Sequence, residues 1–304
     1  MNKYLIFLFL YSSFYSFSQP YLEYYSLINH SEIANLDGNH LQSDSLYNRA
    51  FKLVKRPFKE DYLLAAINAD KLNNLEKVYN YLIEGIKNGL TIKRIKKTSF
   101  ENFKKSKQCK LIRQRYETLH KQYLSTLNLK LRDEIIQMVK SDQKARRSIL
   151  GSWKQMKKTD EYNYNRLLKI IEENNDEWPG FSLIGELIQN DKYSVEGNIA
   201  IVPLHFKKEW VRVLQPYMID AVLHGEMYPY QYARIIDYKF YDSAAKTVID
   251  ENGKRQLALC NFYGTYTNVP ICDCEVAEKE REKIGFEPLD DYYRKVKATY
   301  NCNK

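Results

Sequence analysis

Apolar residues recur every three or four positions along most of this chain, which is the period of an amphipathic α-helix. In the first third, the pattern predicts helices within 45–51, 61–71 and 75–87. Pro57 ends the first of these, and Gly89 closes the third as a C-cap residue. Later helices are expected at 100–127, 127–139, 206–224 and 229–240, and a helix that carries 167–171 is expected to be capped by Asp160 or Asn163.

Signals for β-strands are few. Runs of apolar and β-branched residues at 198–202 and 246–249 are the two candidate strands. Trp178-Pro179-Gly180 interrupts the helical pattern, since the residue before a proline avoids the helical region. The sequence therefore predicts a mainly α protein with little β-structure.

Two of the predicted helices resemble one tetratricopeptide unit. Small and bulky packing residues fall at the spacings of that motif, at Ala66, Ala69, Val78, Leu82 and Gly85. Tyr47 and Ala50 repeat the last two of these positions 35 residues earlier. We therefore expect N-terminal tetratricopeptide-like helical hairpins that pack on a C-terminal α-helical domain. A generic helical hairpin is the alternative.

The N-terminus has the layout of a secretory signal peptide. Lys3 gives a positive start, an apolar and aromatic run follows over 4–17, and small residues at Ser16 and Ser18 occupy the positions that a signal peptidase reads. An uncleaved anchor is the alternative, but the run has about 14 residues and a bilayer needs ~20. We expect cleavage after Ser18 and export to the periplasm or the extracellular space, with no transmembrane segment left after cleavage.

Positive charge is concentrated in one stretch. The formal net charge is +9, and 87–121 holds twelve Lys or Arg residues against two acids, so the rest of the exported chain is slightly acidic. Such a block attracts polyanions through counterion release. For an exported chain, we expect an anionic envelope component or an acidic protein as partner, and no nucleic acid. We assign the basic surface to Lys96, Lys97, Lys104 and Lys105; a merely solvated helical face is the alternative.

Four of the five cysteines follow residue 259, which favours a C-terminal tail tied by disulfides in an oxidising compartment. The odd number leaves at least one cysteine free or paired between chains. One residue separates Cys272 from Cys274, which is not the usual metal-ligand spacing, and no histidine follows them. We therefore expect no metal site and no cofactor.

The second half carries an ordered series of short motifs. They are Asp142-Gln143-Lys144-Ala145-Arg146, Asp160-Glu161-Tyr162-Asn163, the segment 178–185, His205, and Tyr263-Gly264-Thr265. In this order they resemble a bacterial family known only as a domain of unknown function, whose members share DQxxR, DxxN, WPxxSxxG, a single histidine and a late YGT. The resemblance implies no established activity. The chain departs from the family pattern at Lys207 and Tyr238, where an acidic residue and an arginine are usual.

These motifs and the residues between them contain the candidate chemistry. His205 is the candidate for proton transfer, because an imidazole changes its charge near neutral pH. Asp142, Asp160 or Asp237 would orient it or act as an acid. Asp142 and Arg146 are four residues apart and share a helix face, so Arg146 is a candidate ligand-binding fork. Further ligand-binding candidates are Asn163, Glu226 and Tyr263. A structural histidine and a simple helix-stabilising pair are the alternatives.

The chain is expected to divide into a signal peptide at 1–18, a tetratricopeptide-like region at 19–126, the domain of unknown function at 127–268 and a cysteine-containing tail at 269–304. The sequence lacks a nucleophile elbow, a phosphate-cradling glycine loop and a zinc-binding histidine pair. An exported interaction protein is therefore the leading hypothesis. The alternative is an envelope enzyme, hydrolytic in type, that uses His205 with nearby acidic residues.

Overall fold

The computed structural model describes residues 19–147, 153–186, 199–240, 246–249, 255–258 and 260–302. The predicted signal peptide lies outside this part of the chain. Helices make up most of the described residues, so the mainly α prediction is confirmed. The α-helices of the described part are α1 (Pro20–Leu36), α2 (His40–Leu53), α3 (Lys59–Lys71), α4 (Leu75–Lys87), α5 (Ile92–Lys97), α6 (Lys107–Ser125), α7 (Leu129–Arg147), α8 (Trp153–Glu173), α9 (Phe181–Ile184), α10 (Lys208–Leu223), α11 (Pro229–Phe240), α12 (Cys274–Lys283) and α13 (Leu289–Lys295). The shorter elements are the 3-10 helices η1 (Phe103–Lys105), η2 (Ile199–Ile201) and η3 (Pro203–His205) and the antiparallel strands β1 (Lys246–Ile249) and β2 (Arg255–Ala258).

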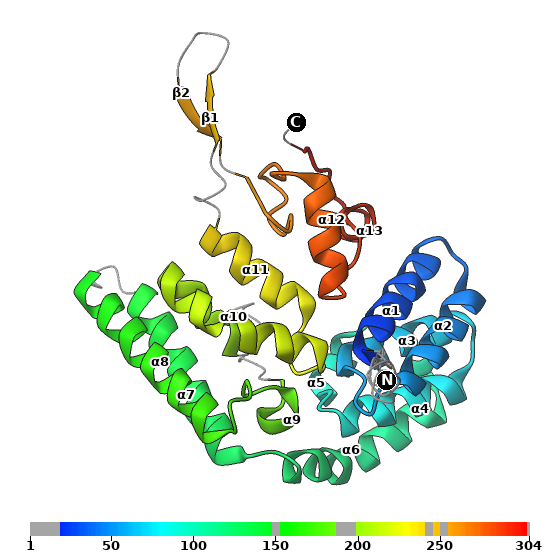
Figure 1. Cartoon of the computed structure of the whole chain (residues 1–304). Coiled ribbons are helices and arrows are strands. Elements are labelled where there is room, and N and C mark those ends of the chain that lie inside the picture. The colour runs from blue at the N-terminus through cyan, green and yellow to red at the C-terminus, as the bar shows by residue number, and fades with distance from the viewer. Residues whose placement is uncertain are drawn as a thin grey trace, which may run out of the picture.

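Figure 1 shows two groups of helices that are joined along the bottom of the view. Helices α1 to α4 form one side, α6 continues from them along the bottom, and the α7–α8 hairpin forms the other side. Helices α9, α10 and α11 lie between the two sides, and α12 and α13 lie close to α1. One apolar core extends through all of these groups. The middle helices therefore connect the N-terminal hairpins to the α7–α8 hairpin.

The pairs α1–α2 and α3–α4 are helical hairpins, as the sequence predicts for this region. Tyr47, Ala50 and Leu82 are fully buried at the contacts. A Cβ at Gly85 would lie 3.3 Å from the Cβ of Tyr62 on α3, so this position needs a small residue for close approach of the two helices. The prediction drawn from the spacing of small residues is confirmed at these positions.

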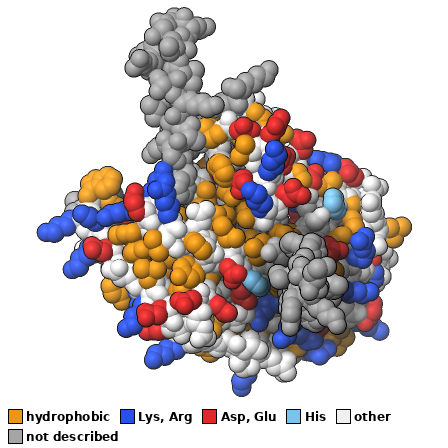
Figure 2. All heavy atoms as spheres, in the orientation of Figure 1, with side chains coloured by type: hydrophobic (Ala, Val, Ile, Leu, Met, Phe, Trp, Pro, Cys, Tyr) orange, Lys and Arg blue, Asp and Glu red, His pale blue; other side chains and the backbone are white. Residues whose placement is uncertain are grey.

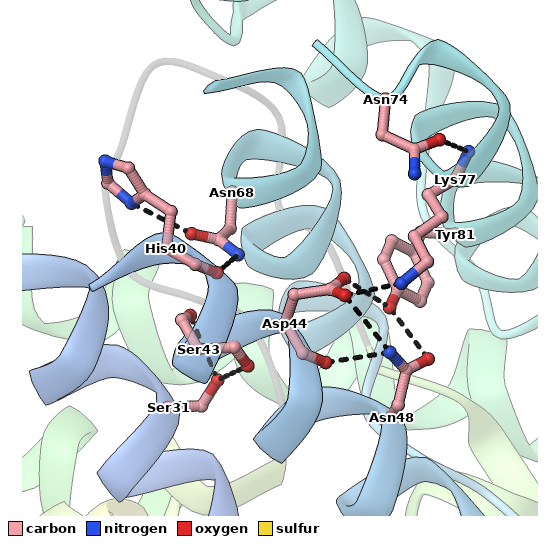
Figure 3. Close-up of polar contacts among 9 residues, drawn as sticks. All are labelled: Ser31, His40, Ser43, Asp44, Asn48, Asn68, Asn74, Lys77 and Tyr81. Carbon is pink, nitrogen blue, oxygen red and sulfur yellow. Dashed lines mark hydrogen bonds and ion pairs between the residues drawn. The ribbon is translucent and has the colours of Figure 1, made fainter. Parts of the chain in front are cut away.

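Polar side chains bond the two hairpins to each other. Figure 3 shows an ion pair between Asp44 of α2 and Lys77 of α4, and the Tyr81 hydroxyl lies 3.2 Å from Asp44 Oδ1. The same hydroxyl lies 3.1 Å from Asn48 Oδ1, one turn further along α2. Helices α2 and α4 are therefore joined across two successive turns, which fixes the position of one along the other.

The single helix predicted over 100–127 is wrong at its start. The structure has η1 and then α6, which begins after its N-cap Ser106. The physical cause is Asp70 at the end of α3. Its carboxylate accepts the backbone N–H groups of 101–103 at distances of 2.5–3.3 Å, and these bonds hold the segment in a turn that a continuous helix would break.

Two further local predictions are wrong, and one is confirmed. The candidate strand at 198–202 is the 3-10 helix η2 in its described part, and Pro203 follows, which has no N–H for a strand ladder. Asp160 and Asn163 do not cap a helix, because both lie inside α8, which begins earlier than the apolar period indicates. The candidate strand at 246–249 is confirmed as β1.

Two disulfides tie the C-terminal part of the chain, as the grouping of four cysteines after residue 259 predicts. Cys260 pairs with Cys272, and Cys274 pairs with Cys302, which leaves Cys109 as a buried free thiol. This part also contains α12 and α13, two helices that the sequence analysis did not predict.

Helix α1 contacts both the N-terminal hairpins and the C-terminal helices. The Tyr25 hydroxyl donates a hydrogen bond of 2.7 Å to the carbonyl oxygen of Val222 on α10. Lys295 of α13 pairs with Glu32 at 2.5 Å. Helix α1 therefore ties the N-terminal hairpins to the C-terminal helices.

Tyr24 fixes α1 on the second hairpin. Tyr24 and Asp61 are both buried, and the tyrosine hydroxyl donates to the Asp61 carboxylate while it accepts the Phe58 N–H at 3.0 Å. Burial raises the pKa of Asp61 well above its ordinary value, and the hydrogen bond from Tyr24 opposes that shift.

We predict that Tyr24→Phe lowers the free energy of unfolding by about 2–6 kcal/mol, since the Asp61 carboxylate and the Phe58 N–H both lose their partner and each such buried group costs about 1–3 kcal/mol. Tyr47→Phe is the matched control, because Tyr47 is equally buried and its hydroxyl bonds to no described residue. We expect Tyr47→Phe to lower the free energy of unfolding by less than about 0.5 kcal/mol. Denaturant unfolding of the wild type and the two variants measures both changes, and equal losses would contradict the assignment.

Candidate functional site

Four polar side chains from three elements meet at one point, and we call them the His205 cluster. Helix α7 supplies Asp142 and Arg146, α8 supplies Asp160, and η3 supplies His205. Asp142 is fully buried; its carboxylate lies 2.8 Å from Arg146 Nη1 and 3.0 Å from His205 Nδ1. Arg146 Nη2 lies 2.5 Å from Asp160 Oδ1. The structure thus brings together four residues that the sequence analysis selected.

The local sequence explains how each side chain reaches this point. Asp142 and Arg146 are one turn apart on α7 and share a face. Helices α7 and α8 form a hairpin, which places Asp160 opposite Arg146. Pro203 opens η3, where its fixed φ suits the first helical position, and His205 ends that short helix next to Asp142.

Asp142 orients the imidazole of His205. With a carboxylate at Nδ1, the neutral ring carries its proton on Nδ1 and keeps Nε2 as an acceptor. Nε2 bonds to no other residue in the described part of the chain, and the side chain is 20% exposed. A ring in this state can accept a proton from a molecule that approaches from solvent.

Asn163 lies one turn beyond Asp160 on α8 and is fully buried. Neither its Oδ1 nor its Nδ2 bonds to another described residue. A buried amide without partners is costly, so a water or a ligand atom is expected beside it. The ligand-binding role of Asn163 remains a prediction, and this unsatisfied amide supports it.

Lys239 of α11, which is not among the residues predicted from the sequence, lies in the same neighbourhood. Burial lowers the pKa of Lys239 from 10.5 to about 8; Asp160 opposes the shift, and Arg146 adds to it. Its Nζ lies 4.7 Å from the ring centre of Tyr238. A lysine in the last turn of an amphipathic helix is usually exposed to solvent. No local pattern in the sequence distinguishes the partly buried Lys239 from such an exposed lysine.

Asp237 is not bonded to His205 within the described residues, and its carboxylate is engaged elsewhere. It is fully buried and accepts four hydrogen bonds of 2.6–2.8 Å from the turn at 262–265, three from backbone N–H groups and one from the Thr265 hydroxyl. Burial raises its pKa above the ordinary value in spite of these bonds. Asp237 therefore anchors the turn that contains Tyr263.

Glu226 is bonded to the segment that carries the WPxxSxxG motif. Its Oε2 accepts the Ser182 N–H at 2.6 Å, and its carbonyl oxygen accepts the Phe181 N–H at 3.3 Å. These contacts position the motif on the loop after α10. The carboxylate of Glu226 thus has a structural partner, whereas its predicted ligand-binding role remains a prediction.

The basic surface lies on α5, η1 and α6. All twelve Lys and Arg side chains of 87–121 are exposed, and Lys87 and Arg94 pair with Glu84 and Glu60 at 2.6 and 3.0 Å. Seven of the others have no side-chain hydrogen bond or ion pair with a described residue: Lys96, Lys104, Lys105, Lys107, Lys110, Arg113 and Lys121. Figure 2 shows Lys and Arg side chains along the lower edge of the molecule, where α6 lies in Figure 1.

No family model, curated protein or solved structure matches this chain. The resemblance to the bacterial family with the same motif order therefore remains a prediction. Among the described helices, none is long and apolar enough to cross a bilayer. In the same part of the chain, no three His, Cys, Asp or Glu side chains are grouped so that they could hold a metal ion.

We predict that Lys239 makes the stability of the fold rise with pH between about 8 and 10.4. Its pKa is about 8 in the folded protein, and about 10.4 is usual in an unfolded chain, so in this window the unfolded state binds more protons and is disfavoured as the pH rises. The measurement is the difference in unfolding free energy between wild type and Lys239→Met across this window. Lys239→Arg, which stays charged throughout, is the control and lacks the rise; a pH-independent difference for Lys239→Met would contradict the shift.

Proposed function

We propose that this chain is an exported protein that binds a polyanionic component of the cell envelope through its basic surface. The observation that carries the proposal is the set of seven exposed cations on η1, α5 and α6 that lack an ion-pair partner among the described residues. A cation already paired with a carboxylate gains little from another anion, whereas an unpaired cation offers its full charge to a partner.

The packing of α6 keeps these charges on the outside. Ile112, Tyr116, Leu119 and Tyr123 are buried along one face, and α6 packs on α4. Because the buried positions follow the helical period, the lysines and arginines of the helix occupy the opposite face. The basic surface is thus set by the same amphipathic pattern that stabilises the helix.

The proposed export rests on two features. Residues 1–18 have the layout of a signal peptide, and two disulfides occur in the described part of the chain. Structural disulfides persist in compartments outside the reducing cytosol. Both features support a protein that works in or beyond the cell envelope.

A second function, hydrolysis, is favoured by the Asp142–His205 contact and the unpaired Nε2 of His205. In such a reaction, Nε2 accepts a proton from an attacking water and returns it to the leaving group. The buried Asp142 carboxylate would stabilise the imidazolium that forms between these two steps.

For the basic surface, we predict that replacing Lys96, Lys97, Lys104 and Lys105 by Gln weakens binding to heparin and to vesicles with anionic lipid. Each lysine near an anionic surface contributes about 1 kcal/mol, so the loss is up to roughly a thousandfold at low salt. The control variant replaces four exposed lysines of α7 and α8 by Gln, at positions 140, 154, 157 and 158. Equal binding by the two variants would contradict the proposal. Comparison of heparin with vesicles shows whether the preferred polyanion is a polymer or a lipid surface.

For hydrolysis, we predict that His205→Gln lowers kcat/KM at least about 100-fold on any substrate that the wild type cleaves, since a positioned base contributes about 10²–10⁴-fold. The assay uses a panel of fluorogenic esters, phosphoesters and peptides. His224→Gln is the control, because His224 is 69% exposed and belongs to α10's end. Equal effects of the two substitutions, or no turnover by the wild type on any substrate, would remove this function.

A further inference from the structure

A cavity of about 170 Å³ lies where the N-terminal hairpins meet the rest of the molecule, and we call it the junction cavity. Its walls come from the segment 55–58, the ends of α4 and α6, Phe181 of α9, and Glu186. Figure 1 shows α9 between the N-terminal helices and the α7–α8 hairpin. A single water needs about 10–15 Å³ of such space, so the junction cavity has room for a compact organic molecule.

One wall of the junction cavity is aromatic. Phe58 and Phe181 both line it, are buried, and have their ring centres 5.8 Å apart. Tyr228 packs against both rings, at 4.4 Å from Phe58 and 5.1 Å from Phe181 between ring centres. Rings held in this way form a rigid apolar surface, which favours a ligand with an aromatic or branched apolar body.

The charge that the junction cavity offers to a ligand is positive. The acidic side chain in its wall, Glu186, pairs with the buried Lys59 at 3.0 Å, so its charge is compensated within the protein. Lys55 and Arg56 also line the junction cavity, and neither side chain has a hydrogen bond or ion pair with a described residue. Two uncompensated cations beside an apolar wall call for an anionic partner.

The WPxxSxxG motif at 178–185 builds part of this wall. Phe181 comes from inside the motif, and Glu186 follows it directly. Gly185 has a φ of +66°, and a Cβ there would lie 2.1 Å from the hydroxyl of Tyr123, so the chain passes this point only with a glycine. The motif belongs neither to the basic surface nor to the His205 cluster. It forms part of the wall of the junction cavity.

We propose that the junction cavity binds a small organic carboxylate with an aromatic or branched apolar body. The planar fork of Arg56 matches a carboxylate through two parallel hydrogen bonds, Lys55 adds a second positive charge, and the aromatic wall contacts the apolar body. An inorganic anion would leave that wall uncovered, and a neutral molecule would leave Arg56 without a partner. This function is separate from polyanion binding at the basic surface.

The test uses phenylacetate and isovalerate as probes, with the neutral phenylacetamide as the matched control ligand. Ligand-observed NMR and calorimetry on the full exported chain measure the affinities. We expect at least one of the two acids to bind and phenylacetamide to bind at least about tenfold more weakly, since a hydrogen bond to a charged group contributes about 1.5–3 kcal/mol. Failure of both acids to bind, or equal binding of phenylacetate and phenylacetamide, would overturn the proposal.

Two variants locate the bound acid. Arg56→Gln is expected to weaken binding about tenfold to a hundredfold. The Tyr21 hydroxyl bonds to the backbone carbonyl oxygen of Arg56, which the substitution keeps, so the fold is expected to stay intact. Lys52→Gln is the matched control, because Lys52 is exposed and close in sequence and does not line the junction cavity. An unchanged affinity in Arg56→Gln would overturn the proposal.

The variant of Lys96, Lys97, Lys104 and Lys105 separates the two proposals. It is expected to bind the acid as the wild type does while it loses heparin. Loss of acid binding in this variant would place the acid on the basic surface and overturn the junction cavity as its site. Unchanged heparin binding in this variant would count against polyanion binding and leave the carboxylate site unaffected.

Discussion

The buried hydrogen bond from Tyr24 to Asp61 holds α1, the helix that contacts both the N-terminal hairpins and the C-terminal helices. Both groups are buried, so neither has water as an alternative partner, and breaking the bond leaves two polar groups unsatisfied. The bond fixes α1 on α3. Through Tyr25 and Glu32, the same helix bonds to α10 and α13. A displacement of α1 would therefore move the C-terminal helices relative to the N-terminal hairpins.

Helix α1 also positions the wall of the junction cavity. Tyr24 accepts the backbone N–H of Phe58, and Tyr21 donates a hydrogen bond of 3.0 Å to the carbonyl oxygen of Arg56. Tyr25 stacks on Phe58 with ring centres 5.9 Å apart. The backbone of the segment before α3 is thus fixed by α1 while the guanidinium of Arg56 has no partner among the described residues. A backbone held in this way loses little conformational entropy when a ligand binds, so the ordering cost falls mainly on the Arg56 side chain.

Local spacing was enough to predict the elements whose packing is local. The period of apolar residues and the small residue Gly85 predicted the N-terminal hairpins, and motif order selected the members of the His205 cluster. Residue spacing did not predict the structure where one side chain binds backbone N–H groups that are distant in the sequence. Asp70 and Asp237 each bind N–H groups 25 or more positions away, which redirects the chain at those points. Lys239 was missed for a related reason, since its burial depends on how α11 packs and not on its neighbours in sequence.

The charges of the His205 cluster favour proton transfer over anion binding. Arg146 is shared between Asp142 and Asp160, so its guanidinium already faces two carboxylates. An incoming anion would have to displace one of them, and a displaced Asp142 would remain buried without its cation, which is costly. Arg56 and the seven unpaired cations of the basic surface meet no such competition within the described residues. Anion recognition is therefore favoured at those two places, and the unpaired Nε2 of His205 is the feature of the cluster that remains open to chemistry.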